Sequence, residues 1–194
     1  RPTTDRECWL GVDLSKSTDF SAVVAVFPDD DGTYDILPWF WLPDERIPAI
    51  EKRTHVDIQR WVRMGLVNTT PGTVVDYGSI EAKIDWCCQN FHVQELCYDP
   101  WNASAFIQRL VDKGLLCIEI RQGGKTLSAP MKYLEELILG KRLRHSGHEV
   151  LTWHADCLTA KTDSLGNICP AKDRLNRDGK RIDGMAALVT ALAR

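Results

Sequence analysis

One uninterrupted apolar run governs how this chain can fold. Residues 21–27 (SAVVAVF) are rich in β-branched side chains and show no polar alternation after the first position. Because side chains of a strand point alternately to opposite faces of a sheet, a strand of this composition has to be covered on both faces. The run therefore predicts a central strand buried between two layers of the protein.

Two further strands are expected beside this run. Residues 8–13 form a short apolar stretch that ends in Asp13, and residues 33–42 carry several aromatic side chains. Residues 29–32 (DDDG) between the second and third segments are typical of a tight turn. The first third of the chain therefore predicts an antiparallel meander of three strands.

Helical and strand-like segments alternate after the meander. Helical spacing of apolar residues predicts helices over 54–64, 80–91 (with Asp76 as N-cap), 106–114, 131–140 and 182–192. Apolar runs predict strands within 66–75 and over 93–98 and 115–120. The order predicts an α/β fold with a mixed sheet, in which parallel strands extend the meander and helices flank it. Residues 141–181 are polar, basic and turn-rich, and predict a hairpin or loop extension that includes 150–153 (VLTW) and 163–167 (DSLGN).

Composition excludes several classes of protein. Hydrophobic residues make up 44% and charged residues 26% of the 194 residues, as in a globular chain of one domain, 1–194. No apolar run approaches the roughly 18 residues of a membrane span. Seven cysteines, an odd number without a C-x-x-C pair, indicate buried thiols in a reducing compartment rather than a disulfide scaffold. The start, residues 1–4 (RPTT), has neither Met nor a signal core, and indicates an excised domain.

Charge is distributed unevenly along the chain. Residues 1–50 hold four Lys or Arg against ten Asp or Glu, whereas residues 141–194 hold ten against six. A basic end on an acidic body indicates a surface that faces an anion, of which nucleic acid is the usual example. A merely solvated basic face is the alternative.

Three aspartates lie at the ends of predicted elements. Asp13 ends the first strand, Asp99 follows the strand over 93–98, and Asp183 opens the last helix. Carboxylates crowded together repel one another and need a cation to stay ionised. Oxygen ligands favour Mg²⁺ or Mn²⁺, and a pair of such ions suits phosphodiester hydrolysis. Taken singly, each aspartate could equally be a helix cap or part of a turn.

Five segments, in order along nearly the whole chain, resemble one protein family. They are GVDLS at 11–15, YDPWNA at 98–103, RQG at 121–123, LSAPMK at 127–132 and RIDGMA at 181–186. Together they closely resemble the nuclease domain of the large terminase subunit of tailed double-stranded DNA bacteriophages.

The resemblance implies an RNase H-like fold and an endonuclease that cuts concatemeric viral double-stranded DNA with little sequence specificity during genome packaging. It implies two Mg²⁺ or Mn²⁺ ions on Asp13, Asp99 and Asp183. Asp19, Asp76 and Asp178 are further candidate ligands. The implied partners are the portal protein, the small terminase subunit and the packaging ATPase domain of the same polypeptide. The implied location is the host cytoplasm, at the procapsid.

The ATPase domain itself is not expected within this chain. Residues 124–126 (GKT) resemble part of a P-loop, but Glu119 stands where that motif needs glycine. The basic segment is expected to hold the DNA backbone through side chains on or beside the predicted hairpin. These candidate DNA contacts are Lys161, Lys172, Arg174, Lys180 and Arg181.

Other functions remain open at this point. The chain could be a DNA-binding or docking module that cuts only within the full-length motor. It could also be a related RNase H-like enzyme, such as a junction resolvase or, less well matched in length, an actin-like phosphotransferase. His145 and His148, like His154 and Cys157, have zinc-like spacing but lack a C-x-x-C half-site, so the histidines are interpreted as loop residues.

Overall fold

The centre of the molecule is a mixed β-sheet. The computed structural model describes residues 6–15, 19–100, 104–172 and 179–194. Within them a seven-stranded sheet has the order β4-β3-β2-β1-β5-β6, with β7 also paired to β3. The strands are β1 (Glu7–Asp13), β2 (Ser21–Pro28), β3 (Tyr34–Pro43), β4 (Asn68–Thr70), β5 (His92–Tyr98), β6 (Cys117–Glu119) and β7 (Leu143–Arg144).

Strand pairing confirms the predicted meander and the parallel strands beside it. β2 pairs antiparallel with β1 and with β3. On its other side, β1 pairs parallel with β5, which pairs parallel with β6. Because β1 and β5 run in the same direction, their carboxyl ends lie at the same edge of the sheet.

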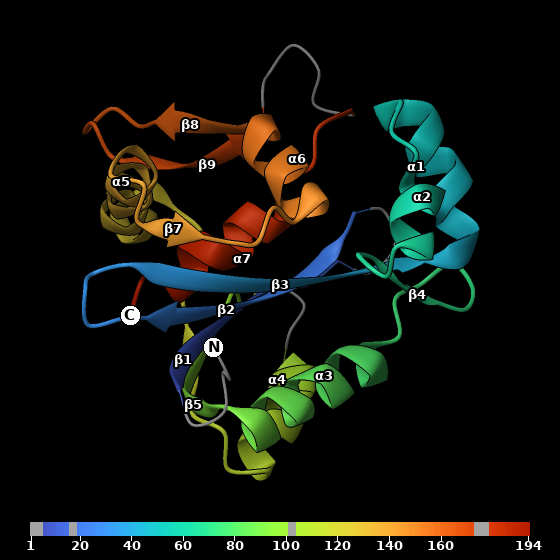
Figure 1. Ribbon diagram of the computed structural model, residues 1–194, viewed down its shortest axis with the longest axis horizontal. Helices are drawn as coiled ribbons and strands as arrows, with labels where there is room; N and C mark the ends of the chain where they lie inside the picture. Colours follow the sequence, from blue (N-terminus) through green and yellow to red (C-terminus); the bar gives the residue numbers. More distant parts are fainter. Residues whose placement is uncertain (1–5, 16–18, 101–103, 173–178) are drawn as a thin grey trace.

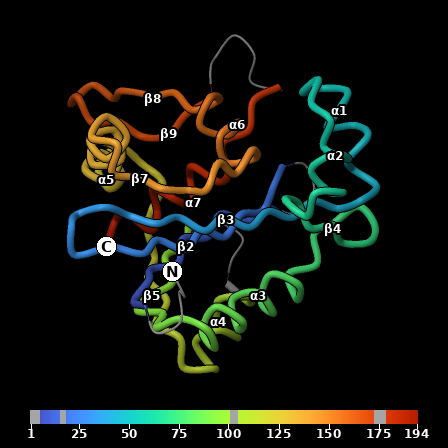
Figure 2. Tube along the Cα trace, viewed as in Figure 1, coloured from blue at the N-terminus to red at the C-terminus, as the bar shows by residue number. Residues whose placement is uncertain are grey.

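Helices cover both faces of this sheet. Figure 1 shows α3 and α4 on one face and α5, α6 and α7 on the other, and the chain trace in Figure 2 follows the same layers. Every residue of β2 from Ser21 to Phe27 is buried, as the apolar run predicts. The helices are α1 (Ile47–Thr54), α2 (Ile58–Arg63), α3 (Tyr77–Asn90), α4 (Ser104–Asp112), α5 (Gly124–Leu139), α6 (Glu149–Cys157) and α7 (Asp183–Ala191).

Two predicted elements differ from the structure. The helix expected over 54–64 is α2, which spans only Ile58–Arg63. Thr54 instead ends α1, a helix that was not predicted, because His55 adopts the left-handed conformation (φ 58°). Residues 150–153, expected in a hairpin or loop, lie in α6. The N-cap of this helix is His148, whose Nδ1 accepts a hydrogen bond from the Leu151 N–H at 3.4 Å.

The expected hairpin forms further along the chain. Strands β8 (Leu158–Thr162) and β9 (Ile168–Lys172) pair antiparallel. Asp163 closes their connection by accepting hydrogen bonds from the N–H groups of Leu165 and Asn167. The hairpin packs against α5, on the side of the sheet that carries α7 (Figure 1).

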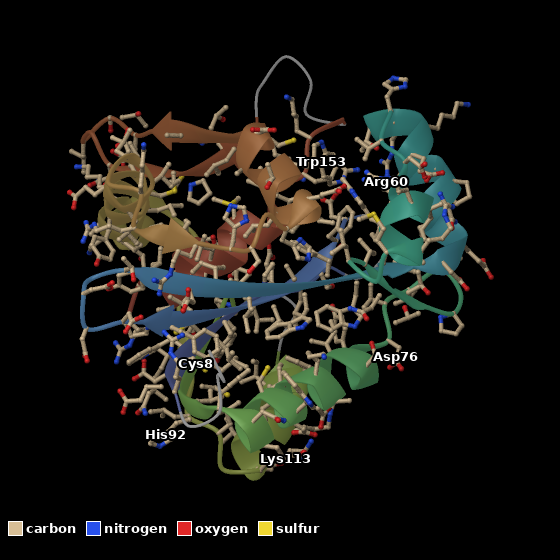
Figure 3. The ribbon with its side chains drawn as sticks, viewed as in Figure 1. Cys8, Arg60, Asp76, His92, Lys113 and Trp153 are labelled. Carbon is tan, nitrogen blue, oxygen red and sulfur yellow. The ribbon has the colours of Figure 1, made fainter. Side chains whose placement is uncertain are left out.

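Side-chain contacts tie the peripheral helices to this core. Arg60 and Trp61 of α2 both donate to the Glu149 carboxylate of α6, and the Trp61 ring lies 5.4 Å from that of Trp153. Figure 3 shows Arg60 and Trp153 where these two helices face each other.

The described residues also settle two expectations from composition. No helix among them is long and apolar enough to cross a bilayer. The cysteines are free thiols, but Cys88 is exposed, so the expectation of buried thiols is wrong for that residue.

Candidate metal centre

Asp13 and Asp99 meet at the carboxyl edge of the two central strands. Asp13 is the last residue of β1, and Asp99 directly follows Tyr98, the last residue of β5. Val12 pairs with Tyr98 in the parallel register, so the two aspartates come one step beyond the last pair. Side chains alternate along a strand, and Gly11 and Asp13 therefore share one face of β1.

Asp183 reaches the same edge on α7, the helix that packs against that face. All nine residues of α7 are buried, and the helix contacts β1 and β2. Close packing depends on Gly11, where a Cβ atom would lie 1.9 Å from the carbonyl oxygen of Ala187. It also depends on Gly184, where a Cβ atom would lie 2.6 Å from the Phe40 ring. In the GVD and DG segments, glycine thus permits the close approach that brings the neighbouring aspartates together.

The electrostatics of the site show how crowded these carboxylates are. Burial raises the pKa of Asp13 well above its usual value, and the nearby charges of Asp183, Asp99 and Asp19 raise it further. Burial and then Asp19 raise the pKa of Asp183 to about 7. Lys172 opposes both increases. The Asp183 Oδ2 atom is buried and has no hydrogen-bond partner among the described residues.

These features fit an oxygen-liganded cation. A buried carboxylate oxygen without a donor is costly, and a hard divalent ion would satisfy it while relieving the repulsion between carboxylates. Among the described residues, however, no three or more His, Cys, Asp or Glu side chains lie close enough together to bind one metal ion. Asp13, Asp99 and Asp183 therefore share one electrostatic environment without converging on a single point.

Asp19 carries an ion-pair cluster beside these carboxylates. Its Oδ1 atom lies 2.6 Å from Arg181 Nε, and its Oδ2 atom accepts a hydrogen bond from Lys172 Nζ at 3.1 Å. The Arg181 side chain is only 3% exposed, and its NH1 group donates to the Lys180 carbonyl. Asp19, expected only as a further candidate ligand, thus links the β8-β9 hairpin and the start of α7 to the cluster.

The remaining predicted residues have varied positions. Lys161 is exposed on β8, and Lys180 is half-buried before α7. Asp76 caps α3 by accepting from the Gly78 N–H at 2.8 Å, which confirms its predicted role as N-cap. Arg174 and Asp178 lie outside the described residues.

The interpretation of His154 as a loop residue is wrong. It lies in α6, is fully buried, and its Nδ1 accepts a hydrogen bond from the Gly184 N–H at 2.9 Å. Burial and the charges of Lys172 and Arg181 hold the pKa of His154 well below its usual value. Sequence reasoning missed this contact because it treated residues 150–153 as extended and so left His154 off any helix.

Tyr77 was also missed. It is the first residue of α3, its hydroxyl is buried without a partner among the described residues, and the charge of Asp13 helps to raise its pKa. The sequence signal that could have placed Tyr77 at the start of a helix is its position directly after the N-cap Asp76.

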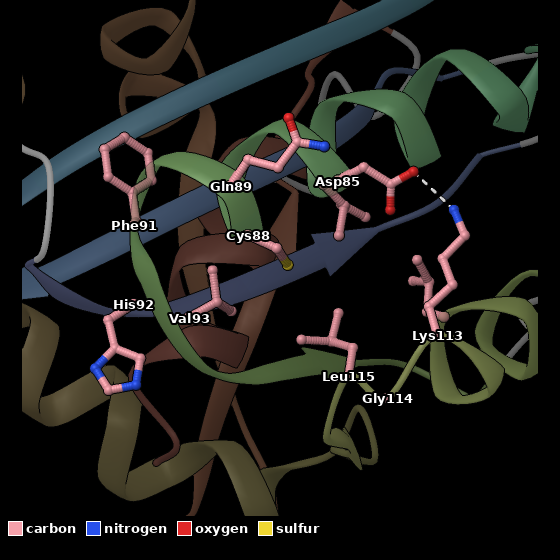
Figure 4. Close-up of a pocket in the computed structure, with 11 residues that line it drawn as sticks. Asp85, Cys88, Gln89, Phe91, His92, Val93, Lys113, Gly114 and Leu115 are labelled. Atoms are coloured by element: carbon pink, nitrogen blue, oxygen red, sulfur yellow. Dashed lines mark hydrogen bonds and ion pairs between the residues drawn. The ribbon is translucent and has the colours of Figure 1, made fainter.

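A separate hollow of about 390 Å³ lies at the amino-terminal end of β5, away from Asp99. Figure 4 shows Cys88, His92 and Leu115 along it, with Lys113 paired to Asp85. Burial keeps the pKa of the Cys88 thiol raised, so the thiol is not an activated nucleophile. We therefore place the candidate site at the carboxylate cluster and not in this hollow.

The chain is similar to known proteins over nearly its whole length. The family described as "Terminase large subunit, endonuclease domain" matches residues 2–194. The large terminase subunit of Enterobacteria phage HK97 is 34% identical over 191 residues, which are 97% of this chain and 37% of that protein. Protein YmfN of Escherichia coli (strain K12) is 31% identical over 195 residues, covering 96% of this chain and 43% of that protein. The chain thus spans less than half the length of these relatives.

Solved structures confirm the expected RNase H-like fold. The crystal structure of the HK97 large terminase matches with a TM-score of 0.88 at 33% identity, over 98% of this chain and 40% of that one. The large terminase nuclease of thermophilic phage G20c with bound magnesium matches with a TM-score of 0.61. That match covers all of this chain and 83% of the other at 12% identity, and so supports the fold alone.

Proposed function

This chain belongs to the family of terminase large subunit endonuclease domains, and we propose that it cuts viral double-stranded DNA in a divalent-cation-dependent reaction during genome packaging. One observation carries the proposal beyond family membership. Asp183 Oδ2 is a buried carboxylate oxygen for which the described part of the chain supplies no donor, in a helix packed on the strand that ends in Asp13. A site that only stabilised the fold would gain from replacing such a group by an apolar one.

The ligands we assign are Asp13, Asp99 and Asp183, and the ions are Mg²⁺ or Mn²⁺. The nuclease of phage G20c, a protein of the same fold, has been crystallised with magnesium and with cobalt. A pair of such ions, when bound, supplies an activated water and stabilises the leaving 3′ oxygen of a phosphodiester. We expect products with 5′-phosphate and 3′-hydroxyl ends.

The chain's own residues prepare this site. The charges of both Asp183 and Asp99 raise the pKa of Asp13, so Asp13 would hold a cation together with either of them. Packing of α7 against β1 keeps bulk water away from Asp183, which is 7% exposed. Arg181 and Lys172, held by Asp19, place positive charge beside the carboxylates, where a phosphate group would arrive.

DNA contacts are proposed on the basic side of the site. Lys161 is exposed on β8. Lys172, which pairs with Asp19, and Lys180 are partly exposed. Arg174 stays a proposed contact from the sequence alone. Arg181 is buried and paired with Asp19, so we assign it to the carboxylate cluster rather than to the DNA surface. Contacts to phosphates carry no sequence information, which suits an enzyme with little sequence preference.

The biological setting is proposed from the family. We expect the substrate to be concatemeric viral DNA. We expect the partners to be the portal protein, the small terminase subunit and an ATPase domain of the same polypeptide. We expect the reaction to take place in the host cytoplasm, at the procapsid.

Plasmid nicking tests the proposal. The wild-type chain is incubated with supercoiled DNA in EDTA, Mg²⁺, Mn²⁺ or Ca²⁺, beside Asp13→Asn, Asp183→Asn and Asp156→Asn. Asp156 is an exposed carboxylate of α6 and serves as the matched control. We expect cleavage with Mn²⁺ or Mg²⁺ that EDTA and the first two substitutions abolish and the control retains.

Other outcomes would point elsewhere. Cleavage by Asp183→Asn at the wild-type rate would contradict the ligand assignment. DNA binding without cleavage under every condition would favour a module that cuts only in the full-length protein, and preference for branched DNA would favour a resolvase.

A further inference from the structure

The helix that carries Asp183 begins without a cap from its own sequence. Its N-cap residue, Ile182, has no side-chain acceptor, although the first N–H groups of a helix need partners from outside the helix. The Gly184 N–H instead donates to His154 Nδ1, at 2.9 Å and fully buried. A side chain thirty residues away, on another helix, thus takes the place of the missing cap.

The His154 ring is held in position by three aromatic neighbours. Its centroid lies 5.1 Å from that of Phe20, 5.0 Å from that of Phe40 and 5.1 Å from that of Trp153. Phe40 and His154 also define the space at Gly184, where a Cβ atom would lie 2.6 Å from the Phe40 ring and 3.2 Å from His154 Nδ1. Any shift of the ring would therefore move the first turn of α7.

The hydrogen bond also determines the tautomer of the His154 imidazole. Because Nδ1 accepts from a backbone N–H, the proton of the neutral imidazole is on Nε2. The Nε2 atom is buried without a hydrogen-bond partner among the described residues. The polar contact that remains for the ring is Gly184, the residue next to Asp183.

We propose that His154 is a positioning residue of the candidate metal centre: by capping the first turn of α7 through Gly184, it holds the Asp183 carboxylate beside Asp13. This role rests on the proposed function, since it acts on a ligand of the proposed ions. Groups that orient a metal ligand from behind typically change metal affinity 10- to 100-fold when they are removed.

Three variants separate this role from simple packing. His154→Leu fills similar space but leaves the Gly184 N–H without an acceptor. His154→Asn keeps an acceptor oxygen at the position of Nδ1. Asp156→Asn changes an exposed residue of the same helix and leaves the ring, its neighbours and the acceptor in place. Binding of Mn²⁺ is measured by titration calorimetry for each variant, for the wild type and for Asp183→Asn.

We expect the dissociation constant for Mn²⁺ to rise about 10- to 100-fold in His154→Leu, with most of the affinity restored in His154→Asn. Asp156→Asn should bind Mn²⁺ as the wild type does. Equal Mn²⁺ affinity in His154→Leu and the wild type would overturn the role of His154 and leave the proposed function standing. A wild type that binds no Mn²⁺, or that binds it as well as Asp183→Asn does, would overturn the proposed function and this role with it.

One measurement needs no variant and decides the matter if His154→Leu does not fold. In ¹⁵N-labelled wild-type protein, the hydrogen bond should transmit a scalar coupling between the Gly184 amide nitrogen and His154 Nδ1. The imidazole nitrogen shifts should show the proton on Nε2. Absence of the coupling, or a proton on Nδ1, would refute the cap.

Discussion

The charge of Asp183 should destabilise the fold when no cation is bound. Its pKa lies at about 7 in the folded protein, against 3.8 for an unperturbed carboxyl, because burial and Asp19 disfavour the charged form. Since one pKa unit corresponds to about 1.4 kcal/mol, this difference corresponds to roughly 4 kcal/mol at high pH. Asp183→Asn removes the charge at nearly constant volume, so it should stabilise the metal-free protein by up to about that amount.

The sign of the pH dependence follows from the same pKa. A carboxyl whose folded pKa is raised binds its proton more tightly in the folded state than in the unfolded state. The destabilisation of the fold by the charged Asp183 carboxylate is therefore absent below about pH 4. It increases as the pH rises to about 7 and stays constant at higher pH. Urea unfolding in EDTA at pH 5 and pH 8 should show the advantage of Asp183→Asn increasing with pH.

A bound cation should make the wild type more stable than Asp183→Asn, the reverse of the order expected in EDTA. A ligand that binds only the folded state stabilises it in proportion to the logarithm of its concentration over the dissociation constant. Saturating Mn²⁺ at pH 8 should therefore raise the unfolding midpoint of the wild type and leave that of Asp183→Asn unchanged. Asp156→Asn, on the exposed side of α6, should follow the wild type throughout. The reasoning is refuted if Asp183→Asn is no more stable than the wild type at pH 8 in EDTA.

Two further predictions test the packing of α7 and the basic side of the site. Gly11→Ala places a Cβ atom 1.9 Å from the Ala187 carbonyl, so urea unfolding should show a loss of about 3 kcal/mol. Gly123→Ala, with open space around it, should lose less than about 1 kcal/mol, and equal losses would contradict the packing argument. Lys161→Ala should weaken DNA binding and lower the slope of affinity against salt by about 1, measured by fluorescence anisotropy, while the exposed Lys52→Ala should leave it unchanged.

The central sheet could be predicted because its signals are local. The apolar run of β2 and the turn before β3 act over a few residues, and Asp76 caps α3 through its own neighbours. α6 escaped prediction for the opposite reason. Its apolar residues 150–153 resemble a strand, and its N-cap is a histidine ring, which is not among the usual capping residues.

The candidate site also combines features that local sequence signals predict with long-range contacts that they do not. The sequence places Asp13, Asp99 and Asp183 at the ends of elements, and the register of β1 and β5 brings the first two to one edge. It could not reveal that Lys172 and Arg181 turn toward Asp19, because Lys172 is 153 residues away from it and ion pairs leave no local pattern. A separation of thirty residues likewise hides the contact of His154 with Gly184.

The order of the chain makes the site depend on the completed fold. α7, the last helix along the sequence, packs on β1 and β2, the first two strands, and its nine residues are all buried. Burial of its apolar residues has to outweigh the repulsion that Asp183 meets beside Asp13, because no cation helps until the site exists. A chain that carries this cost cannot be selected for stability alone, since replacing the carboxylate would relieve it. The buried apolar face of α7 is therefore the support that lets an electrostatically unfavourable cluster persist in the folded chain, and the proposed cations would relieve the repulsion within it.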